Sequence, residues 1–242
     1  MKRLLGLLLM VGILGVPLFA LAAPSAANSG ADAPKLDNRL DAASSTLENI
    51  MHVPVKGIPY SIAQHARCVI VVPGLFKGAF IFGAEYGQGV ATCRTDHGWS
   101  GPVFVRMAGG SWGFQIGGKG TELVMVVTDK RGLDDLLSDK FTIGAGASAA
   151  VGPVGRTANA STDITMRADI LSWSRSKGLF AGVDLKGVSV SQNVADTAEF
   201  YGSVHPFRQI LAGDVRSPAS ADEFLHTVER YFGAARRYED NH

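Results

Sequence analysis

Along the middle of the chain, apolar and polar residues alternate with a period close to two, which is the spacing of a β-strand. The clearest case is the segment 164–185, where two alternating runs flank the basic sequence Arg175-Ser176-Lys177-Gly178. Ser176 and Gly178 permit a tight reversal, because glycine adopts positive φ without a steric cost. The pattern therefore predicts a β-hairpin with two cations at its tip.

Further strand candidates are short and follow one another at the spacing of hairpins. The run 121–128 is apolar at almost every position, so we expect it to be buried on both faces of a sheet. Pro73-Gly74 is expected to end the first strand, and a turn is expected at residues 85–87. The candidates are 68–72, 79–83, 89–94, 103–108, 111–116, 121–128 and the glycine- and alanine-rich run 141–150.

Helical periodicity marks both ends of the chain. The apolar residues of 35–51 fall on one helical face, and Pro54 is expected to end this helix. Such a helix could lie on a membrane surface, but its polar face mixes both charges, so we expect it to pack against the domain. The remaining predicted helices are 59–65, 131–138, 194–201, 206–211 and a final amphipathic helix over 217–237.

Helices at the two ends thus enclose a region of strands, without the strand–helix alternation of a doubly wound fold. The 29 glycines favour strands, tight turns and close backbone packing over long helices. With 46% hydrophobic and 19% charged residues, the chain is globular and not disordered. We expect an α+β fold: a single domain with a glycine-rich, mostly antiparallel sheet or partial barrel flanked by N- and C-terminal helices.

The first residues have the features of a secretory signal peptide. Lys2 and Arg3 precede an apolar run over 4–19, and Ala20-Leu21-Ala22 offers a cleavage site. A membrane anchor is the alternative, although the apolar run is short. We expect an exported, periplasmic protein, peripheral at a membrane. The expected divisions are a signal peptide (1–22), a flexible leader (23–34), the domain with its flanking helices (35–237) and a C-terminal tail (238–242).

Charge and motifs exclude several classes of function. The net charge of +1 falls to −1 once Lys2 and Arg3 are removed, which does not suggest binding of nucleic acid. The six histidines lack metal-binding spacing, and no nucleophile elbow or phosphate-binding loop is present. We therefore expect no metal and no cofactor. Asp96 and His97 could form an acid–base pair, but a turn with incidental polar residues is the simpler interpretation, so the sequence does not support an enzyme.

Two cysteines, Cys68 and Cys93, remain in the mature chain. An even number of cysteines in an oxidising compartment favours a disulfide, and both fall at ends of predicted strands. Two buried free thiols are the alternative, since cysteine packs as a small hydrophobic residue. The sequence leaves both open.

Distinctive segments occur in order at 76–80, 86–89, 112–117, 151–156 and 171–183. Together they closely resemble the SYLF lipid-binding domain family. The likeness extends over roughly residues 50–213, and an ordered series of motifs is more specific than any one of them. The family occurs in bacterial exported proteins and in eukaryotic proteins joined to SH3 or FYVE modules. The resemblance implies binding of acidic phospholipids, phosphoinositides among them; an exported protein would not meet the actin with which some eukaryotic members associate.

Four cations are candidate lipid-binding residues: Lys77, Arg156, Arg175 and Lys177. Each lies in a glycine-containing turn or strand end, where backbone amides and cationic side chains together suit a phosphate. Solvated cations at unrelated loop tips are the alternative. We expect the protein to bind phospholipid with acidic headgroups, without catalysis. A structural protein of the cell envelope that binds a protein partner through exposed sheet edges is the second expectation.

Overall fold

The structure is a computed structural model, and it describes residues 33–52, 57–79, 82–112, 119–145, 148–152, 168–176, 179–180 and 185–233. The predicted signal peptide and C-terminal tail lie outside these residues. Within them, no helix is both long and apolar enough to span a membrane.

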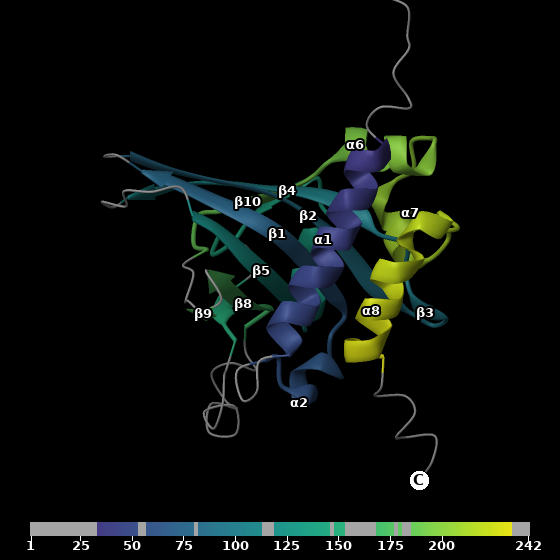
Figure 1. Cartoon of the computed structure of the whole chain (residues 1–242), viewed down its shortest axis with the longest axis horizontal. Coiled ribbons are helices and arrows are strands. Elements are labelled where there is room, and N and C mark those ends of the chain that lie inside the picture. The colour runs from purple at the N-terminus through teal and green to yellow at the C-terminus, as the bar shows by residue number, and fades with distance from the viewer. Residues whose placement is uncertain are drawn as a thin grey trace, which may run out of the picture.

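The chain forms a single α+β domain in which one curled sheet is flanked by helices (Figure 1). The helices are α1 (Ala33–Met51), α2 (Tyr60–Ala63), α3 (Lys130–Leu136), α6 (Val194–Tyr201), α7 (Phe207–Ala212), the short 3-10 helix η1 (Ala219–Ala221) and α8 (Asp222–Phe232). The strands are β1 (Cys68–Ala79), β2 (Phe82–Thr95), β3 (Gly98–Trp99), β4 (Val103–Trp112), β5 (Lys119–Val127), β6 (Lys140–Thr142), β7 (Ala149–Val151), β8 (Ile170–Ser176), β9 (Leu179–Phe180) and β10 (Ser189–Gln192).

The strands follow the order β6-β10-β4-β2-β1-β5-β8-β7, with β3 paired to β2 and β9 paired to β8. All the described pairings are antiparallel except β7 with β8, which is parallel. The expectation of a mostly antiparallel, partly closed sheet between terminal helices is therefore confirmed.

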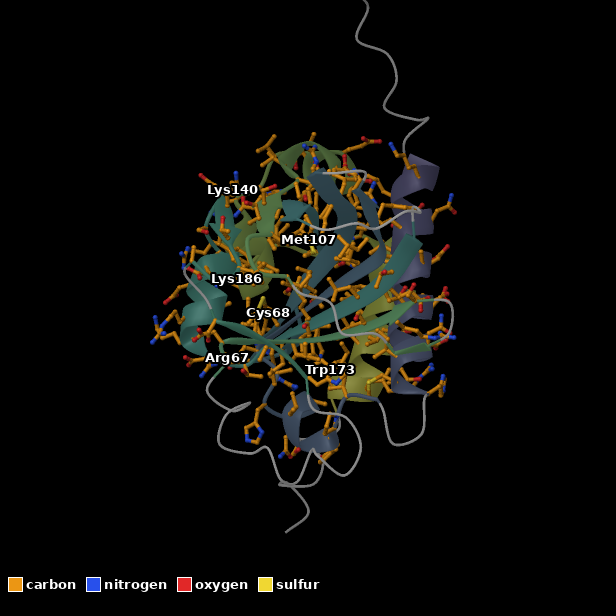
Figure 2. All side chains as sticks on the ribbon, turned by 90° about the vertical axis from the view of Figure 1, so that its left-hand side faces the viewer. Arg67, Cys68, Met107, Lys140, Trp173 and Lys186 are labelled. Atoms are coloured by element: carbon orange, nitrogen blue, oxygen red, sulfur yellow. A yellow bond between two sulfur atoms is a disulfide. The ribbon has the colours of Figure 1, made fainter. Side chains whose placement is uncertain are left out.

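The central strands are buried on both faces, as their continuous apolar sequences predict. Val69 and Val71 of β1 pack under α1 and α8, against residues such as Leu47 and Phe224. The alternate residues of β1 point into the curled side of the sheet, where α3 and α7 help to close the core. Figure 2 shows two residues of this second core, Cys68 and Met107, well inside the outline of the molecule.

Cys68 and Cys93 are directly opposite each other on β1 and β2, and they form a disulfide. Of the two alternatives that the sequence leaves open, the structure has the disulfide. It joins the start of β1 to the end of β2, and both half-cystines are buried.

The expected end of the first strand at Pro73-Gly74 is wrong, because β1 continues to Ala79. The register with β2 shifts between Val71 and Gly74, so the proline lies in an irregularity of the ladder. Proline has no backbone N–H to donate, and such an irregularity leaves it unpaired. Of the candidate strand over 79–83, residue 79 ends β1 and residues 82–83 begin β2, while residues 80–81 lie outside the described residues.

The expected turn at residues 85–87 is also wrong, since these residues pair with Leu75–Lys77 inside the β1–β2 ladder. Gly87 is present for close packing: a Cβ there would lie 2.8 Å from a methyl carbon of Val72. Gly109-Gly110 similarly lies within β4, which joins 103–108 to the start of the separately predicted 111–116. Glycine marks close approach of neighbouring segments here, not reversal of the chain.

Two further boundaries differ from expectation. The predicted strand 141–150 is divided into β6 and β7, with turn residues at 143–145 between them. The first strand of the central hairpin is β8, which lies closer to the C-terminus than the alternating run predicted before Arg175. Arg175 therefore lies in a strand and not in a turn. The reversal itself is confirmed, because Ser176 pairs with Leu179.

The helix predictions are closer to the structure. Helix α6 matches 194–201, and α3 and α7 match to within two residues. Asn193 caps α6 by accepting a hydrogen bond from the backbone N–H of Asp196, and Gly202 ends it at φ 72°. The capping residue and the terminating glycine lie next to the helix in the sequence, so the helix can be predicted without knowledge of the fold.

Candidate functional site

The strands β1, β2, β4 and β5 extend beyond the cover of α1 and finish at one end of the sheet (Figure 1). We call this the distal end, and define it by residues 76–79, 82–86, 108–112 and 119–120. The C-terminal end of β8 lies on the same side, because β8 is antiparallel to β5. The distal end is a place where residues far apart in sequence meet.

Two aromatic residues lie side by side at the distal end. Phe76 of β1 and Tyr86 of β2 are register partners, and they are 59% and 48% exposed. Their row continues into Gly120 of β5 and Ala108 of β4, both of which are exposed. The result is an exposed apolar row across four strands, which we call the aromatic row.

The aromatic row faces the same side of the sheet as α1. Gln88, two residues from Tyr86, accepts a hydrogen bond from Arg39 of α1 at 2.7 Å, and residues two apart in a strand share a face. Arg39 also forms an ion pair with Asp196 of α6. This polar contact marks the limit of the buried core, beyond which the aromatic row is uncovered.

Glycines allow the Phe76 ring to lie close to the sheet. A Cβ at Gly74 would be 3.3 Å from one ring carbon, and a Cβ at Gly120 would be 3.7 Å from another. The ring thus covers two positions without side chains, yet more than half of the residue stays exposed. A purely structural role in covering these glycines would not require so much exposed surface.

Lys77 follows Phe76 and occupies the next row of the ladder. Its register partners are Lys119 on β5 and Glu85 on β2. Glu85 is buried. Along β1, this lysine row comes directly after the aromatic row. Lys119 was not identified from the sequence, since only the strand pairing brings it opposite Lys77.

Arg175 lies opposite Glu122 of β5, and its Nη1 is 3.4 Å from Glu122 Oε2. The other carboxylate oxygen of Glu122 accepts a hydrogen bond from Asn49 Nδ2 of α1 at 2.9 Å. The Arg175 side chain is 23% exposed, so it links β8, β5 and α1 instead of extending freely into water. Its contact with a lipid stays a prediction.

The structure therefore brings two of the four predicted lipid-binding residues, Lys77 and Arg175, to the same end of the sheet. Glu122 is two residues from Gly120 of the aromatic row, about 7 Å along β5. Arg156 and Lys177 lie outside the described residues. The aromatic pair was missed because the sequence shows alternation but not which strand ends remain uncovered.

Asp96 and His97, the weak candidates for catalysis, occupy the turn between β2 and β3. Both are exposed, and the backbone N–H of His97 donates to Thr95 Oγ1 at 3.3 Å. In the described part of the chain, no group of three or more His, Cys, Asp or Glu side chains could hold a metal ion. These observations favour the interpretation as a turn.

Comparison with known proteins identifies the family. Residues 108–231, just over half of the chain, match the family model described as "Ysc84: Las17-binding protein actin regulator". The chain belongs to the Ysc84 (SYLF) family. The matched range covers β4 from Ala108 onward, β5, β8 and most of α8, and therefore two of the four strands that form the distal end.

Relatives in the Ysc84 family are fungal and animal proteins. Protein YSC84 of Saccharomyces cerevisiae is 30% identical over 189 residues, which are 76% of this chain and 40% of the relative. The SH3 domain-containing protein PJ696.02 of Schizosaccharomyces pombe is 34% identical over 176 residues, covering 71% of this chain and 40% of the relative. The human SH3 domain-containing YSC84-like protein 1 is 28% identical over 189 residues, which are 77% of this chain and 54% of the relative.

The chain spans about two-fifths to one-half of the length of these curated relatives. The family description names binding to Las17 and regulation of actin, and it names no reaction. These words apply to the proteins that carry them. What this chain shares with them is the domain described above.

Proposed function

We propose that this protein binds, without catalysis, to the surface of membranes that contain acidic phospholipids, and that the distal end of the sheet is the contact. The observation that carries the proposal is the exposed pair Phe76 and Tyr86, one residue from the register pair Lys77 and Lys119. Aromatic side chains favour the boundary between headgroups and acyl chains. Lysines beside them are attracted to an anionic surface, each by about 1 kcal/mol.

The pairing of two lysines gives a further argument. Like charges directly opposite each other destabilise a ladder, and Lys77 and Lys119 are direct partners. An anionic surface at the distal end would reduce this repulsion, and binding would then stabilise the fold.

The signal peptide predicted over 1–22 and the Cys68–Cys93 disulfide together support an exported, periplasmic location. Structural disulfides persist in oxidising compartments and are rare in the cytosol. The membrane that the protein meets would then be one of those bounding the periplasm.

Co-sedimentation with vesicles tests the proposal. We expect the protein to sediment with vesicles that contain an anionic phospholipid, less with neutral vesicles, and less at high salt. The double variant Phe76→Ser/Tyr86→Ser should bind anionic vesicles about tenfold more weakly, at roughly 1 kcal/mol or less for each exposed aromatic surface. Retained binding by that variant would refute the distal end as the contact.

A matched control is available. Tyr60 is 53% exposed and Val204 is 73% exposed, and both lie away from the distal end. The variant Tyr60→Ser/Val204→Ser removes similar apolar surface and should bind vesicles as the wild type does. Equal losses in the two variants would indicate nonspecific adsorption.

A protein partner in the cell envelope is the second candidate. The observation in its favour is that relatives are named for binding a protein, as in LAS seventeen-binding protein 3 of Saccharomyces cerevisiae. The same aromatic row could pack against such a partner. Capture of one envelope protein that is insensitive to salt, together with no sedimentation on anionic vesicles, would favour this function over the first.

A further inference from the structure

A cavity of about 620 Å³ lies at the opposite end of the sheet from the aromatic row. Its lining comes from the start of β1, the end of β2, Thr128 after β5, and the helices α3 and α7. We call it the proximal cavity. Phe76 lies nine positions after Arg67, a residue of the cavity lining, and this is on the order of 30 Å along an extended strand. The two sites are therefore separate.

One wall of the proximal cavity is apolar. Leu133 and Leu137 of the α3 region and Leu211 and Ala212 of α7 line it, and the disulfide-bonded Cys93 contributes as well. The mouths of barrel-like sheets are common positions for ligand sites, and cavities of roughly 300–1,000 Å³ hold small ligands. The proximal cavity has both the position and the size of such a site.

The lining is also basic. Arg67, Arg94 and Arg208 line the cavity together with a single acidic residue, Asp96, which gives this lining a formal charge of +2. Arg67 immediately precedes β1 and Arg208 lies on α7, so cations from the sheet and from a helix border the same space as the leucines. This is the arrangement that suits a molecule with an apolar chain and an anionic head.

The three arginines have different roles. Arg94 is committed to the fold: its Nε donates to the Ala66 carbonyl at 3.0 Å, and its Nη2 donates to the Phe232 carbonyl at 2.6 Å. Its guanidinium also lies over the Trp99 ring, 4.8 Å from the centroid. Arg94 therefore ties α2 and the end of α8 to the sheet and has little left to offer a ligand.

Arg67 and Arg208 are different, because neither guanidinium forms an ion pair or hydrogen bond with another residue in the described ranges. The backbone of Arg67 is nevertheless fixed, since its N–H donates to Val127 and its carbonyl accepts from Arg94. Arg67 is exposed, whereas the adjacent Cys68 is buried; both are labelled in Figure 2. Arg208 is anchored by α7, whose Phe207 and Ile210 are buried.

From these contacts we infer that the proximal cavity binds a single-chain anionic amphiphile. The Arg67 and Arg208 guanidiniums receive the anionic head, for which arginine offers paired N–H donors. The apolar chain lies against Leu133, Leu137 and Leu211. The head is a carboxylate, as in a free fatty acid, or a phosphate, as in a lysophospholipid. This site does not depend on membrane contact at the distal end.

Calorimetric titration of the oxidised protein with dodecanoate, below its micellar concentration, tests the inference. We expect Arg67→Gln/Arg208→Gln to weaken binding at least tenfold, since each arginine supplies charge-assisted hydrogen bonds. The control Arg216→Gln/Lys35→Gln removes two exposed cations outside the proximal cavity and should bind as the wild type does. Equal binding by the Arg67/Arg208 variant and the wild type would overturn the inference.

A second variant tests the apolar wall. Ala212 is exposed at the end of α7, so Ala212→Trp should fold normally while filling the cavity, and we expect it to abolish dodecanoate binding. Dodecanol should bind at least tenfold more weakly than dodecanoate, and equal affinities would contradict the role of the arginines. Glycerol phosphate, which has a head without a chain, should also bind weakly; affinity equal to that of dodecanoate would contradict the role of the leucines.

The choice of head is settled by comparing dodecanoate with a lysophosphatidate of the same chain length. Tighter binding of the lysophosphatidate supports a lysophospholipid ligand, and tighter binding of dodecanoate supports a fatty acid. Phe76→Ser/Tyr86→Ser should leave dodecanoate binding unchanged, while the cavity variants should keep their binding to vesicles. Loss of dodecanoate binding in the Phe76/Tyr86 variant would place the amphiphile at the distal end and overturn the inference.

Discussion

Arg175 and Glu122 lie opposite each other on neighbouring strands, with Nη1 and Oε2 separated by 3.4 Å. Asn49 of α1 donates to the same carboxylate, so one acidic side chain holds together two strands and a helix. The Arg175 guanidinium is thereby partly neutralised near the distal end. This relationship determines what substitution of either residue should do.

Glu122→Gln removes a negative charge near the distal end and releases the Arg175 guanidinium. We expect it to strengthen binding to anionic vesicles a few-fold and to lower the free energy of unfolding by less than about 1 kcal/mol, since the pair is partly exposed. Arg175→Gln should cost similar stability and weaken vesicle binding. Co-sedimentation and urea unfolding of both variants provide the measurement. If both variants bind vesicles as the wild type does, Arg175 acts only as a structural brace.

The disulfide should contribute substantially to stability. Cys68 and Cys93 are separated by 25 positions, and closing a loop of this length constrains the unfolded chain by about 3 kcal/mol. We expect Cys68→Ser/Cys93→Ser to lower the unfolding midpoint, and reductant to reproduce the loss in the wild type. Calorimetry with and without reductant is the measurement. Labelling of two thiols in the unreduced, denatured protein would show that the bond is absent.

Asp169 should make stability depend on pH at the acidic end. Burial alone would raise the pKa of Asp169, but the N–H and hydroxyl of Ser148 donate to it at 2.7 Å each, and Arg131 lies 3.9 Å away. Together these contacts hold the pKa below its usual value. A depressed pKa stabilises the fold above the unfolded value of about 3.9, and the contribution is lost as the pH falls through the folded value.

Asp169→Asn should therefore lower the free energy of unfolding by about 1–3 kcal/mol at pH 7 and flatten its decline below pH of about 4. Urea unfolding at several pH values measures both effects. Asp134→Asn is the control, because Asp134 is exposed and forms a surface ion pair with Lys130 one helical turn away. Parallel pH curves for wild type and Asp169→Asn would contradict the assignment.

The sequence predicted those elements whose determinants are local. The residues that cap and end helix α6, Asn193 and Gly202, directly flank it in the sequence. The continuous apolar run of β5 predicts burial on both faces, and its residues Leu123–Val127 are buried. Glycine misled the prediction at Gly87 and Gly109, because the same residue serves turns and close approach of neighbouring chains. Gly152 is a further case of close approach, since a Cβ there would overlap the buried ring of Trp173.

The candidate site was less predictable, because it depends on strand register. The pairing of Lys77 with Lys119 joins residues 42 positions apart, and that of Phe76 with Tyr86 matters only because α1 ends its cover before reaching them. Arg175 was expected at a solvated tip, but its partner Glu122 is 53 positions away. No local pattern contains this information.

The depth to which the aromatic row enters a membrane is the most direct test of the proposed function. Phe76→Trp places an indole in the row, and Val204→Trp places one at an exposed position elsewhere. With anionic vesicles that carry bromine on the upper acyl chain, we expect fluorescence of the Phe76→Trp variant to shift to the blue and to be quenched beyond the wild type. The Val204→Trp variant should show neither effect. Equal quenching of the two variants, or no quenching of Phe76→Trp on vesicles that demonstrably hold the protein, would contradict the account.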